Sequence, residues 1–231
     1  MSKRIVVAID GPGGAGKSTI ARRLAVRLGF LYIDTGAMYR AVALWAERQG
    51  VDWDDRLAME QLAIAAEIAL SSNPVQVILN EEDVTEAIRR PEISQGASKV
   101  SAIGGVRRAL VDKQRRMAES ASVVMEGRDI GTVVFPNADV KIFLDAAQDV
   151  RAERRMKELG EKAPPPPPRE RVITELQERD ERDRTRAESP LMQAPDALLV
   201  DTTRLSIEEV EEAILKIIRE KTANGKEFVR S

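Results

Sequence analysis

Residues 10–19 read Asp-Gly-Pro-Gly-Gly-Ala-Gly-Lys-Ser-Thr, and this stretch decides the fold. It fills the pattern G-x-x-x-x-G-K-[ST], in which glycines let backbone N–H groups converge on phosphate oxygens. The apolar run 5–9 precedes it, and Ile20, Leu24 and Leu28 follow it at the spacing of one helix face. The motif therefore lies between a strand and a helix, where the helix N-terminus adds its partial positive charge to a phosphate site.

We expect this loop to bind a nucleoside triphosphate. Lys17 is the cation that would reach the β- and γ-phosphates, and the Ser18 hydroxyl is the predicted Mg²⁺ ligand. The predicted ATP-binding residues are Gly11, Pro12, Gly13, Gly14, Ala15, Gly16, Lys17, Ser18 and Thr19.

The same glycines allow a second interpretation. Gly11, Gly13 and Gly16 also match G-x-G-x-x-G, and Asp34 stands near the position of the ribose-binding acid in a dinucleotide fold. The Lys-Ser pair of the motif has no role in a dinucleotide site and two roles in a triphosphate site. The triphosphate interpretation is favoured, and a dinucleotide-dependent oxidoreductase and a non-catalytic nucleotide-binding module remain alternatives.

The composition restricts the chemistry. The chain has 231 residues, 32% of them charged and 43% apolar, with a formal net charge of −2 and neither cysteine nor histidine. These counts exclude disulfides, thiol nucleophiles and the side chain most often used as a general base. Catalysis must rest on carboxylates, lysine, arginine and a hard cation, and phosphoryl transfer suits that set because it depends on positioning and charge neutralisation.

The same numbers bear on partners and location. A net charge of −2 provides no global positive field for nucleic acid. The N-terminal residues 1–4 lead directly into a strand without the apolar region of a signal peptide, and no apolar run approaches the length of a membrane span. We expect a cytoplasmic protein that acts on small molecules and contacts neither nucleic acid nor membrane.

Short apolar runs separated by helical segments predict the fold class. The fold is expected to be α/β, a doubly wound five-stranded parallel sheet. The five predicted strands are residues 5–9, 30–33, 122–125, 140–144 and 197–200. Since ligands bind at the carboxyl ends of parallel strands, the residues that follow these runs are the candidate site residues.

A hairpin interrupts the alternation of strands and helices. The pattern predicts a helix over 52–72, a strand over 74–79, a polar turn over 80–83 and a returning strand at 84–85. We interpret residues 60–100, with approximate edges, as a subdomain inserted into the core.

Three segments near the predicted strand ends carry polar groups. Thr35 follows the second strand and is expected to cap the next helix, which carries Arg40 in its second turn. The segment Glu126-Gly127-Arg128-Asp129 follows the third strand, and an acid at that point resembles the second Mg²⁺-binding motif of phosphate-loop enzymes. Ser206 and Glu209 form a capping box that opens the last helix, and residues 223–231 are expected to be a frayed tail.

The segment from Arg151 to Arg186 is dense in arginine and is divided by the five prolines Pro164–Pro168. Such a run cannot be helical, so we expect two charged helices joined by a stiff connector. On the second helix Arg179, Asp183 and Arg186 share a face, with Arg182 at its border. The alternative is a solvated helix with surface ion pairs, but arginine suits phosphate recognition, and a lid at about 151–187 is favoured.

Four motifs together resemble bacterial cytidylate kinases, phosphate-loop nucleoside monophosphate kinases, from Ile5 to about Lys221. They are the phosphate loop, D-T-G-A-M-Y-R at 34–40, E-G-R-D-I-G-T-V-V-F-P at 126–136 and R-D-E-R-D-R-T-R at 179–186. The resemblance implies one kinase domain that transfers phosphate from ATP to CMP or dCMP, with Mg²⁺. It implies a monomer with a core of residues 1–59, 101–150 and 188–231, a nucleoside-monophosphate-binding insert at about 60–100 and the lid.

The resemblance also assigns roles. Lys17, Arg128 and Arg186 would be catalytic. CMP would contact Thr35, Arg40, Ser98, Arg107, Arg128, Asp129, Arg179, Asp183 and Arg186. Arg40, Arg128 and Arg186 match the phosphate-binding positions. Arg179 and Asp183 match the sugar-binding positions, and Ser98, Arg107 and Asp129 match those that contact cytosine.

The chemistry of cytosine agrees with the last group, because its amino group suits a carboxylate and its O2 and N3 suit arginine or hydroxyl donors. Uracil presents an acceptor instead of that amino group, which an ionised Asp129 would oppose. A kinase for another small acceptor such as AMP or shikimate is the nearest alternative in the same fold. A switch GTPase is disfavoured, since the sequence has no N-K-x-D motif.

Overall fold

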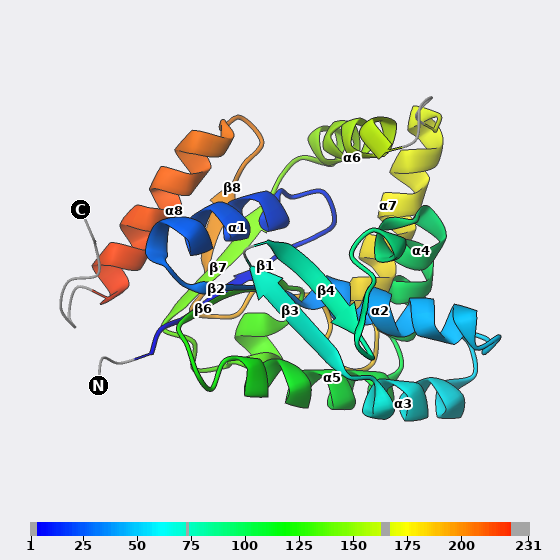
Figure 1. The fold of residues 1–231 in the computed structure, drawn as a ribbon. Coiled ribbons are helices and arrows are strands. Elements are labelled where there is room, and N and C mark those ends of the chain that lie inside the picture. The colour runs from blue at the N-terminus through cyan, green and yellow to red at the C-terminus, as the bar shows by residue number, and fades with distance from the viewer. Residues whose placement is uncertain (1–3, 73, 163–166, 223–231) are drawn as a thin grey trace.

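A computed structural model describes residues 4–72, 74–162 and 167–222, and in that part of the chain the largest element is a five-stranded parallel sheet (Figure 1). Its strand order is β2-β6-β1-β7-β8, with β1 in the centre. The strands are β1 (Val6–Asp10), β2 (Leu31–Asp34), β6 (Val123–Gly127), β7 (Val140–Asp145) and β8 (Leu198–Asp201). All five predicted strands are confirmed, and their carboxyl ends share one edge.

Alternate residues of the strands enter two cores. Val7 and Ile9 pack with helices α1 (Lys17–Leu28) and α8 (Ile207–Thr222) on one face. Ala8 packs on the other face, against α5 (Gly104–Met117) and the π-helical turn η2 (Ile130–Val134). The sheet is thus covered on both sides, as a parallel sheet must be to bury its apolar strands.

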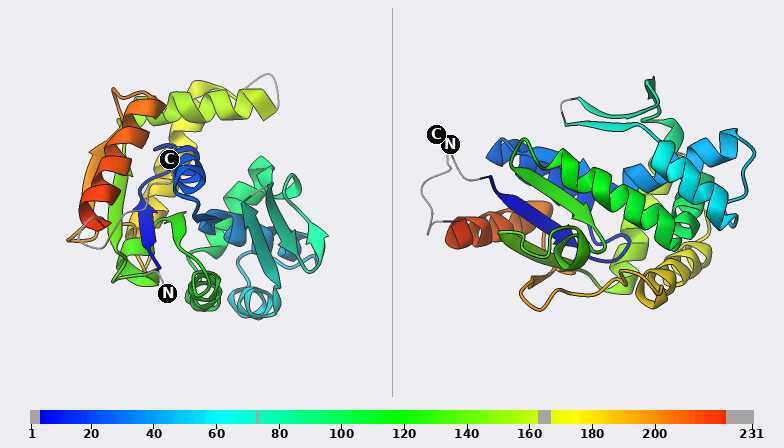
Figure 2. Two further views of the ribbon diagram at one scale, coloured as in Figure 1. Left: turned by 60° about the vertical axis from the view of Figure 1, so that its left-hand side comes forward. Right: turned by 90° about the horizontal axis from the view of Figure 1, so that it is seen from below.

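A second, smaller sheet stands beside the first (Figure 2). It is antiparallel, with order β3-β4-β5. Its strands are β3 (Ile68–Ser72), β4 (Val75–Leu79) and β5 (Glu82–Asp83). Around it lie α2 (Thr35–Arg48), α3 (Arg56–Ala65), η1 (Ala87–Arg89) and α4 (Pro91–Val100), which form a core with α5.

This region corrects two predictions. The helix expected over 52–72 ends at Ala65, and Ile68–Ser72 is strand β3 instead. Local apolar spacing cannot reveal the partner of this segment, and its pairing with Val75–Leu79 overrides the helical pattern. The returning strand is Glu82–Asp83 rather than 84–85, because the Val77 N–H bonds the Thr85 hydroxyl.

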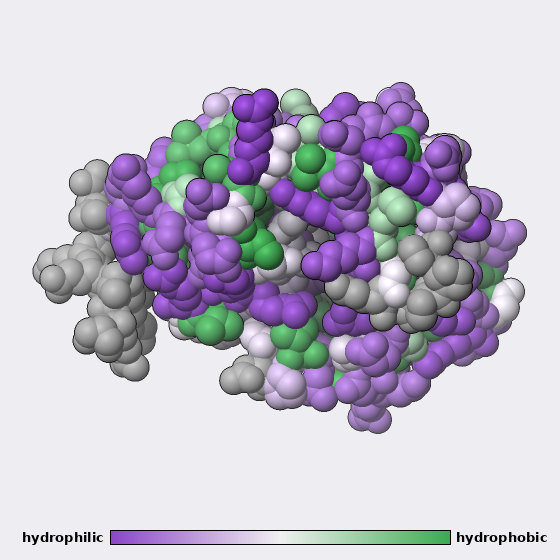
Figure 3. All heavy atoms as spheres, turned by 90° about the horizontal axis from the view of Figure 1, so that it is seen from above, coloured by the Kyte–Doolittle hydropathy of each residue, from purple (hydrophilic) through white to green (hydrophobic). Residues whose placement is uncertain are grey.

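Two charged helices, α6 (Gln148–Lys162) and α7 (Arg169–Thr185), confirm the expected helix pair. Ala152, Val172 and Leu176 form a small apolar core between them. Pro168 caps α7, while most of the proline run and the tail 223–231 lie outside the described residues. Seen from above, the surface is mainly hydrophilic, with apolar side chains in smaller groups (Figure 3).

The last helix begins as the capping box predicts. The Ser206 hydroxyl accepts from the Glu209 N–H at 3.2 Å, and the Glu209 carboxylate accepts from the Ser206 N–H at 2.7 Å. None of the helices in the described residues is long and apolar enough to span a membrane.

Candidate functional site

The loop between β1 and α1 has the backbone conformation that a phosphate nest requires. Gly11, Gly14 and Gly16 have φ values of 148°, 76° and 91°, which side-chain-bearing residues rarely adopt. A Cβ at Gly11 would lie 1.9 Å from the Leu144 carbonyl oxygen. The first turn of α1 has no acidic residue and its N-cap no side-chain bond, so the helix N-terminus suits an anion.

Lys17 is buried inside this loop. Its ammonium donates to the Pro12 carbonyl at 2.7 Å, and only 5% of the residue is exposed. Burial, followed by repulsion from Arg128, lowers the pKa of Lys17 to about 7. A cation held so unfavourably gains most from an anionic ligand, which is the role predicted for it.

Ser18 lies beside the acid predicted from the strand β6 motif. Its hydroxyl donates to Glu126 Oε2 at 3.0 Å, and the Tyr32 phenol donates to Glu126 Oε1 at 2.5 Å. Burial, followed by repulsion from Asp34, raises the pKa of Glu126. Hydroxyl and carboxylate oxygens suit Mg²⁺, and no group of three or more acidic side chains in the described residues forms a metal site alone. The pair therefore fits a cation that takes its other ligands from phosphate and water.

The residue that caps α2 differs from the one that the sequence predicted. The helix cap is Asp34, whose carboxylate accepts from the Ala37 N–H at 3.0 Å and from Arg40 at 2.8 Å. Burial opposes ionisation of Asp34, but Arg40, the Ala37 N–H and Arg128 together outweigh it and hold the pKa below its usual value. Thr35 is the first helical residue, so its hydroxyl is free to donate to the Glu126 carbonyl at 2.7 Å. The prediction that Thr35 caps α2 was wrong.

Seven of the nine residues predicted to contact CMP line one cavity at the carboxyl edge of the sheet. They are Thr35, Arg107, Arg128, Asp129, Arg179, Asp183 and Arg186. Helices α2, α5 and α7 and the segment after β6 bring them together, although Thr35 and Arg186 are 151 positions apart in the sequence. The cavity of about 40 Å³ is smaller than the roughly 300–1,000 Å³ typical of ligand pockets. We therefore expect its walls to move apart when a nucleotide binds.

Arg40 and Ser98 do not line this cavity. Arg40 donates to Asp34 at the end of β2, and its charge repels that of Arg179. The buried Ser98 hydroxyl accepts from Arg182 at 3.2 Å, so the arginine at the border of the predicted face, rather than a ligand, engages it in this structure.

Cations outnumber acids in the cavity. Four arginines and two aspartates line it, namely Arg107, Arg128, Arg179, Arg186, Asp129 and Asp183. Arg128 pairs with Asp183 at 2.9 Å, and Arg107 pairs with Asp129. Arg179 Nε is buried without a hydrogen-bond partner among the described residues. Burial, followed by repulsion from Arg128, lowers the pKa of Arg179 to about 10. This excess of positive charge is suited to a phosphate.

Two residues to which the sequence analysis gave no role contact Arg107, which pairs with Asp129. The buried Arg107 lies over the Tyr39 ring, 5.6 Å from its centroid, and donates to the Ser101 carbonyl at 3.1 Å. Both Tyr39 and Ser101 line the cavity. Tyr39 lies within the motif 34–40, which was its only signal, and Ser101 carried none.

Helices α6 and α7 reach the phosphate loop. Arg151 donates to the Gly13 carbonyl at 2.9 Å and to Asp180 at 2.5 Å, while the other Asp180 oxygen accepts from the Gly13 N–H at 3.4 Å. The Arg154 guanidinium donates to the Thr202 hydroxyl at 2.9 Å and to the Thr202 carbonyl at 2.8 Å. The arginine-rich composition predicted such contacts without indicating which arginines make them.

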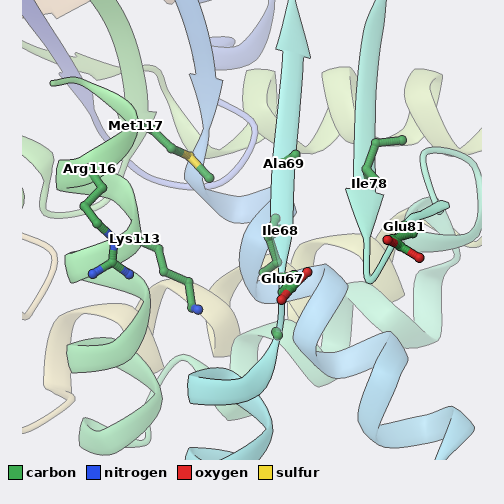
Figure 4. A pocket seen from close by; sticks show the side chains of 9 residues that line it. Glu67, Ile68, Ala69, Ile78, Glu81, Lys113, Arg116 and Met117 are labelled. Carbon is green, nitrogen blue, oxygen red and sulfur yellow. The ribbon is translucent and has the colours of Figure 1, made fainter. Parts of the chain in front are cut away.

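A larger cavity of about 540 Å³ lies elsewhere, between the β3–β4 hairpin and α5 (Figure 4). Ile68 and Ile78 of the hairpin are among its lining residues, as are Lys113, Arg116 and Met117 of α5. It contains none of the predicted site residues.

Comparisons with known proteins agree with the motifs. A family model described as cytidylate kinase matches residues 7–220. A cytidylate kinase from Solibacter usitatus is 65% identical over 227 residues, which cover 98% of this chain and 97% of that protein. One from Lactiplantibacillus plantarum is 48% identical over 220 residues, 94% of this chain and 96% of that protein.

Among solved structures, an uncharacterized protein from Eubacterium ventriosum aligns with a TM-score of 0.53 and 13% identity, over 93% of this chain and 98% of that chain. This likeness supports the α/β fold alone. The match to the family model and the two close relatives extend over nearly the whole length, and on that basis the chain belongs to the cytidylate kinase family.

Proposed function

We propose that the protein transfers the γ-phosphoryl group of ATP to CMP or dCMP and releases ADP with CDP or dCDP. The observation that carries the proposal is the placement of two unlike anion sites at one sheet edge. The loop 11–19 offers a nest and a buried lysine, and the adjoining cavity offers arginines with two aspartates. Membership in the cytidylate kinase family supports the choice of acceptor.

The donor half would hold ATP by the backbone of the loop 11–19 and by Lys17. Ser18, with Glu126 hydrogen-bonded to it, would hold Mg²⁺. Magnesium would supply neutralisation of the charge on the phosphate oxygens. Arg151 and Arg154, which contact the loop and Thr202 in this structure, support the proposal that α6 and α7 form a lid over ATP at about 151–187.

The acceptor half would bind the phosphate of CMP through Arg40, Arg128 and Arg186, and its sugar through Arg179 and Asp183. Ser98, Arg107 and Asp129 would recognise cytosine. The salt bridge between Arg107 and Asp129 fixes the carboxylate beside the cavity, where it can accept from the amino group of the base. The assignment of Ser98 requires its hydroxyl to exchange Arg182 for the base.

No strong base is needed. A phosphate oxygen of CMP, already ionised at neutral pH, attacks the γ-phosphorus while the bond to the β-phosphate oxygen breaks and ADP leaves. Lys17, Arg128 and Arg186 would neutralise the charge that spreads over the transferred group. The insert at about 60–100 and the lid would close over both nucleotides and exclude water, which would otherwise accept the phosphoryl group.

Three further parts of the proposal concern assembly, location and partners. A monomer is proposed because the resemblance to bacterial cytidylate kinases implies one. The net charge of −2 and the absence of a membrane-spanning helix in the described residues are compatible with a cytoplasmic enzyme that acts on nucleotides rather than nucleic acid.

A coupled assay of ADP release with CMP, dCMP, UMP and AMP offered in parallel tests the proposal. We expect CMP and dCMP to be preferred. A preference for UMP or AMP would overturn the cytosine assignment of Ser98, Arg107 and Asp129. Absence of acceptor-dependent ADP release, with retained ATP binding, would show a nucleotide-binding module instead.

A further inference from the structure

The β3–β4 hairpin touches the main sheet at its tip. The Ser72 hydroxyl accepts from the Tyr32 N–H at 2.9 Å and donates to the Tyr32 carbonyl at 3.3 Å. Val75, on the other side of the tip, packs against the core that includes Tyr32. Toward its other end, the hairpin is separated from α5 by the open groove of about 540 Å³ (Figure 4).

Tyr32 continues this contact toward the donor site. In the parallel pairing of β2 with β6, Tyr32 is opposite Val124, so the diagonal neighbour on the same face is Glu126. The ring is buried, with 4% of the residue exposed, and Arg22 lies over it at 5.7 Å. Its phenol reaches Glu126 Oε1 at 2.5 Å, while the other carboxylate oxygen accepts from Ser18.

These bonds form one continuous series from Ser72 through Tyr32 and Glu126 to Ser18. We propose that Tyr32 is a positioning residue that couples the inserted hairpin to the metal end of the triphosphate site. This inference rests on the proposed function and adds a connection between the inserted hairpin and the donor half of the site. Ser72 bonds both backbone polar groups of Tyr32, the phenol donates to the Glu126 carboxylate, and that carboxylate accepts a hydrogen bond from the Ser18 hydroxyl.

The direction of the Ser18 hydrogen bond determines whether the hydroxyl can bind a cation. When the hydroxyl donates its proton to Glu126, its lone pairs point away from the carboxylate and are available to a cation. If the phenol is removed, one oxygen of a buried carboxylate loses its donor, and the carboxylate is free to turn away from Ser18. Metal-assisted binding of ATP should then weaken, while metal-free binding to the loop should not.

Calorimetric titration of ATP in EDTA and in saturating Mg²⁺ tests this on the full-length protein. Tyr32→Phe keeps the ring and removes the phenol. It should reduce the Mg²⁺-dependent gain in ATP affinity about 10-fold, with the dissociation constant in EDTA unchanged within about twofold. Ser72→Ala should reduce the same gain by roughly 2- to 10-fold. Ser71→Ala, one residue away on the same strand, is the matched control and should have no effect.

The double variant tests whether Ser72 acts through Tyr32. In the Tyr32→Phe background, Ser72→Ala should produce no further loss of the Mg²⁺-dependent gain, because the series is already broken. Hydrogen exchange supplies a second readout. The Tyr32 N–H, held by Ser72, should exchange more slowly with Mg²⁺ and ATP present, and this protection should disappear in Tyr32→Phe.

Several results would overturn the inference. An unchanged Mg²⁺-dependent gain in Tyr32→Phe would do so, and so would equal losses of affinity in EDTA and in Mg²⁺, which indicate a merely structural role. If Tyr32→Phe does not fold, Ser72→Ala decides by the same comparison. If wild-type protein lacks CMP-dependent ADP release, the proposed function fails instead.

Discussion

The two halves of the candidate site are built in opposite ways. The donor loop is one contiguous stretch whose backbone forms the site, and its glycines are required because a Cβ would strike Leu144 at Gly11 or Arg151 at Gly14. The acceptor cavity is built from side chains of β6, α2, α4, α5 and α7, positioned by ion pairs such as Arg128 with Asp183. A site made of backbone is specified by local sequence, whereas a site made of charged side chains depends on the packing of distant elements.

The charge balance differs as well. In the loop a single buried ammonium is bonded to a carbonyl oxygen. In the cavity each aspartate has arginine partners, and the excess charge is shared among several groups. Removing a group should therefore cost more in the donor half than in the acceptor half.

The largest effect is expected for Lys17→Ala. It removes the buried cation aimed at the triphosphate, so kcat/KM should fall by roughly 10³-fold or more. Steady-state ADP release measures it. Lys216→Ala, on the exposed side of α8, should retain the wild-type value within about twofold. A loss below about tenfold for Lys17→Ala would contradict the donor role.

Helix α7 offers a matched pair for the acceptor half. Arg179→Ala should raise the KM for CMP by about 10- to 100-fold, which corresponds to the loss of one or two charge-assisted hydrogen bonds. The KM for ATP should stay nearly unchanged. Arg171→Ala removes an exposed arginine that pairs with Glu175 and should change neither constant. Equal changes in both KM values for Arg179→Ala would mean that the two halves are not separate.

Asp129→Asn tests specificity within the cavity. The amide no longer repels the carbonyl of uracil, so the ratio of kcat/KM for CMP to that for UMP should narrow by about 10-fold. The fraction of folded protein is expected to decrease in this variant, because Arg107 loses its buried partner. The ratio of the two kcat/KM values does not depend on that fraction. Asp196→Asn, an exposed partner of Lys141, is the control. An unchanged ratio would assign Asp129 a structural role only.

The smallest predicted effect is a proton uptake. With the pKa of Lys17 at about 7, most of this side chain is neutral at pH 8, and a bound triphosphate should raise its pKa again. Binding of ATP in EDTA should therefore take up about 0.9 proton more at pH 8, and about 0.1 proton more at pH 6, than binding to Lys17→Arg, in which the ATP phosphate still titrates but the side chain does not. Titration calorimetry in buffers of different ionisation enthalpy measures this. Lys17→Arg keeps the charge without titrating, so the difference between the two proteins isolates the proton of Lys17. Equal uptake in the two proteins would rule out Lys17 as the source.

The comparison also explains which predictions succeeded. The five strands and the nest of glycines follow from local patterns. A short apolar run favours a buried strand, and a glycine permits positive φ, whichever distant residues pack nearby. Strand β3 was missed, because its five residues become a strand only by pairing with β4. The helix cap was assigned to Thr35 instead of Asp34, since both residue types cap helices and the choice depends on where Glu126 lies.

By itself, the sequence determined the parallel sheet, the loop 11–19 and the candidates for two nucleotides, since those depend on residue type and spacing. Only the tertiary structure decided that Arg40 and Ser98 stand outside the cavity, that Arg151 and Asp180 reach Gly13, and that Ser72 is joined to Ser18 through Tyr32 and Glu126. The physical reason is that a side-chain hydrogen bond holds only over about 3 Å. Which distant residues come within that distance is set by how the sheets and helices pack.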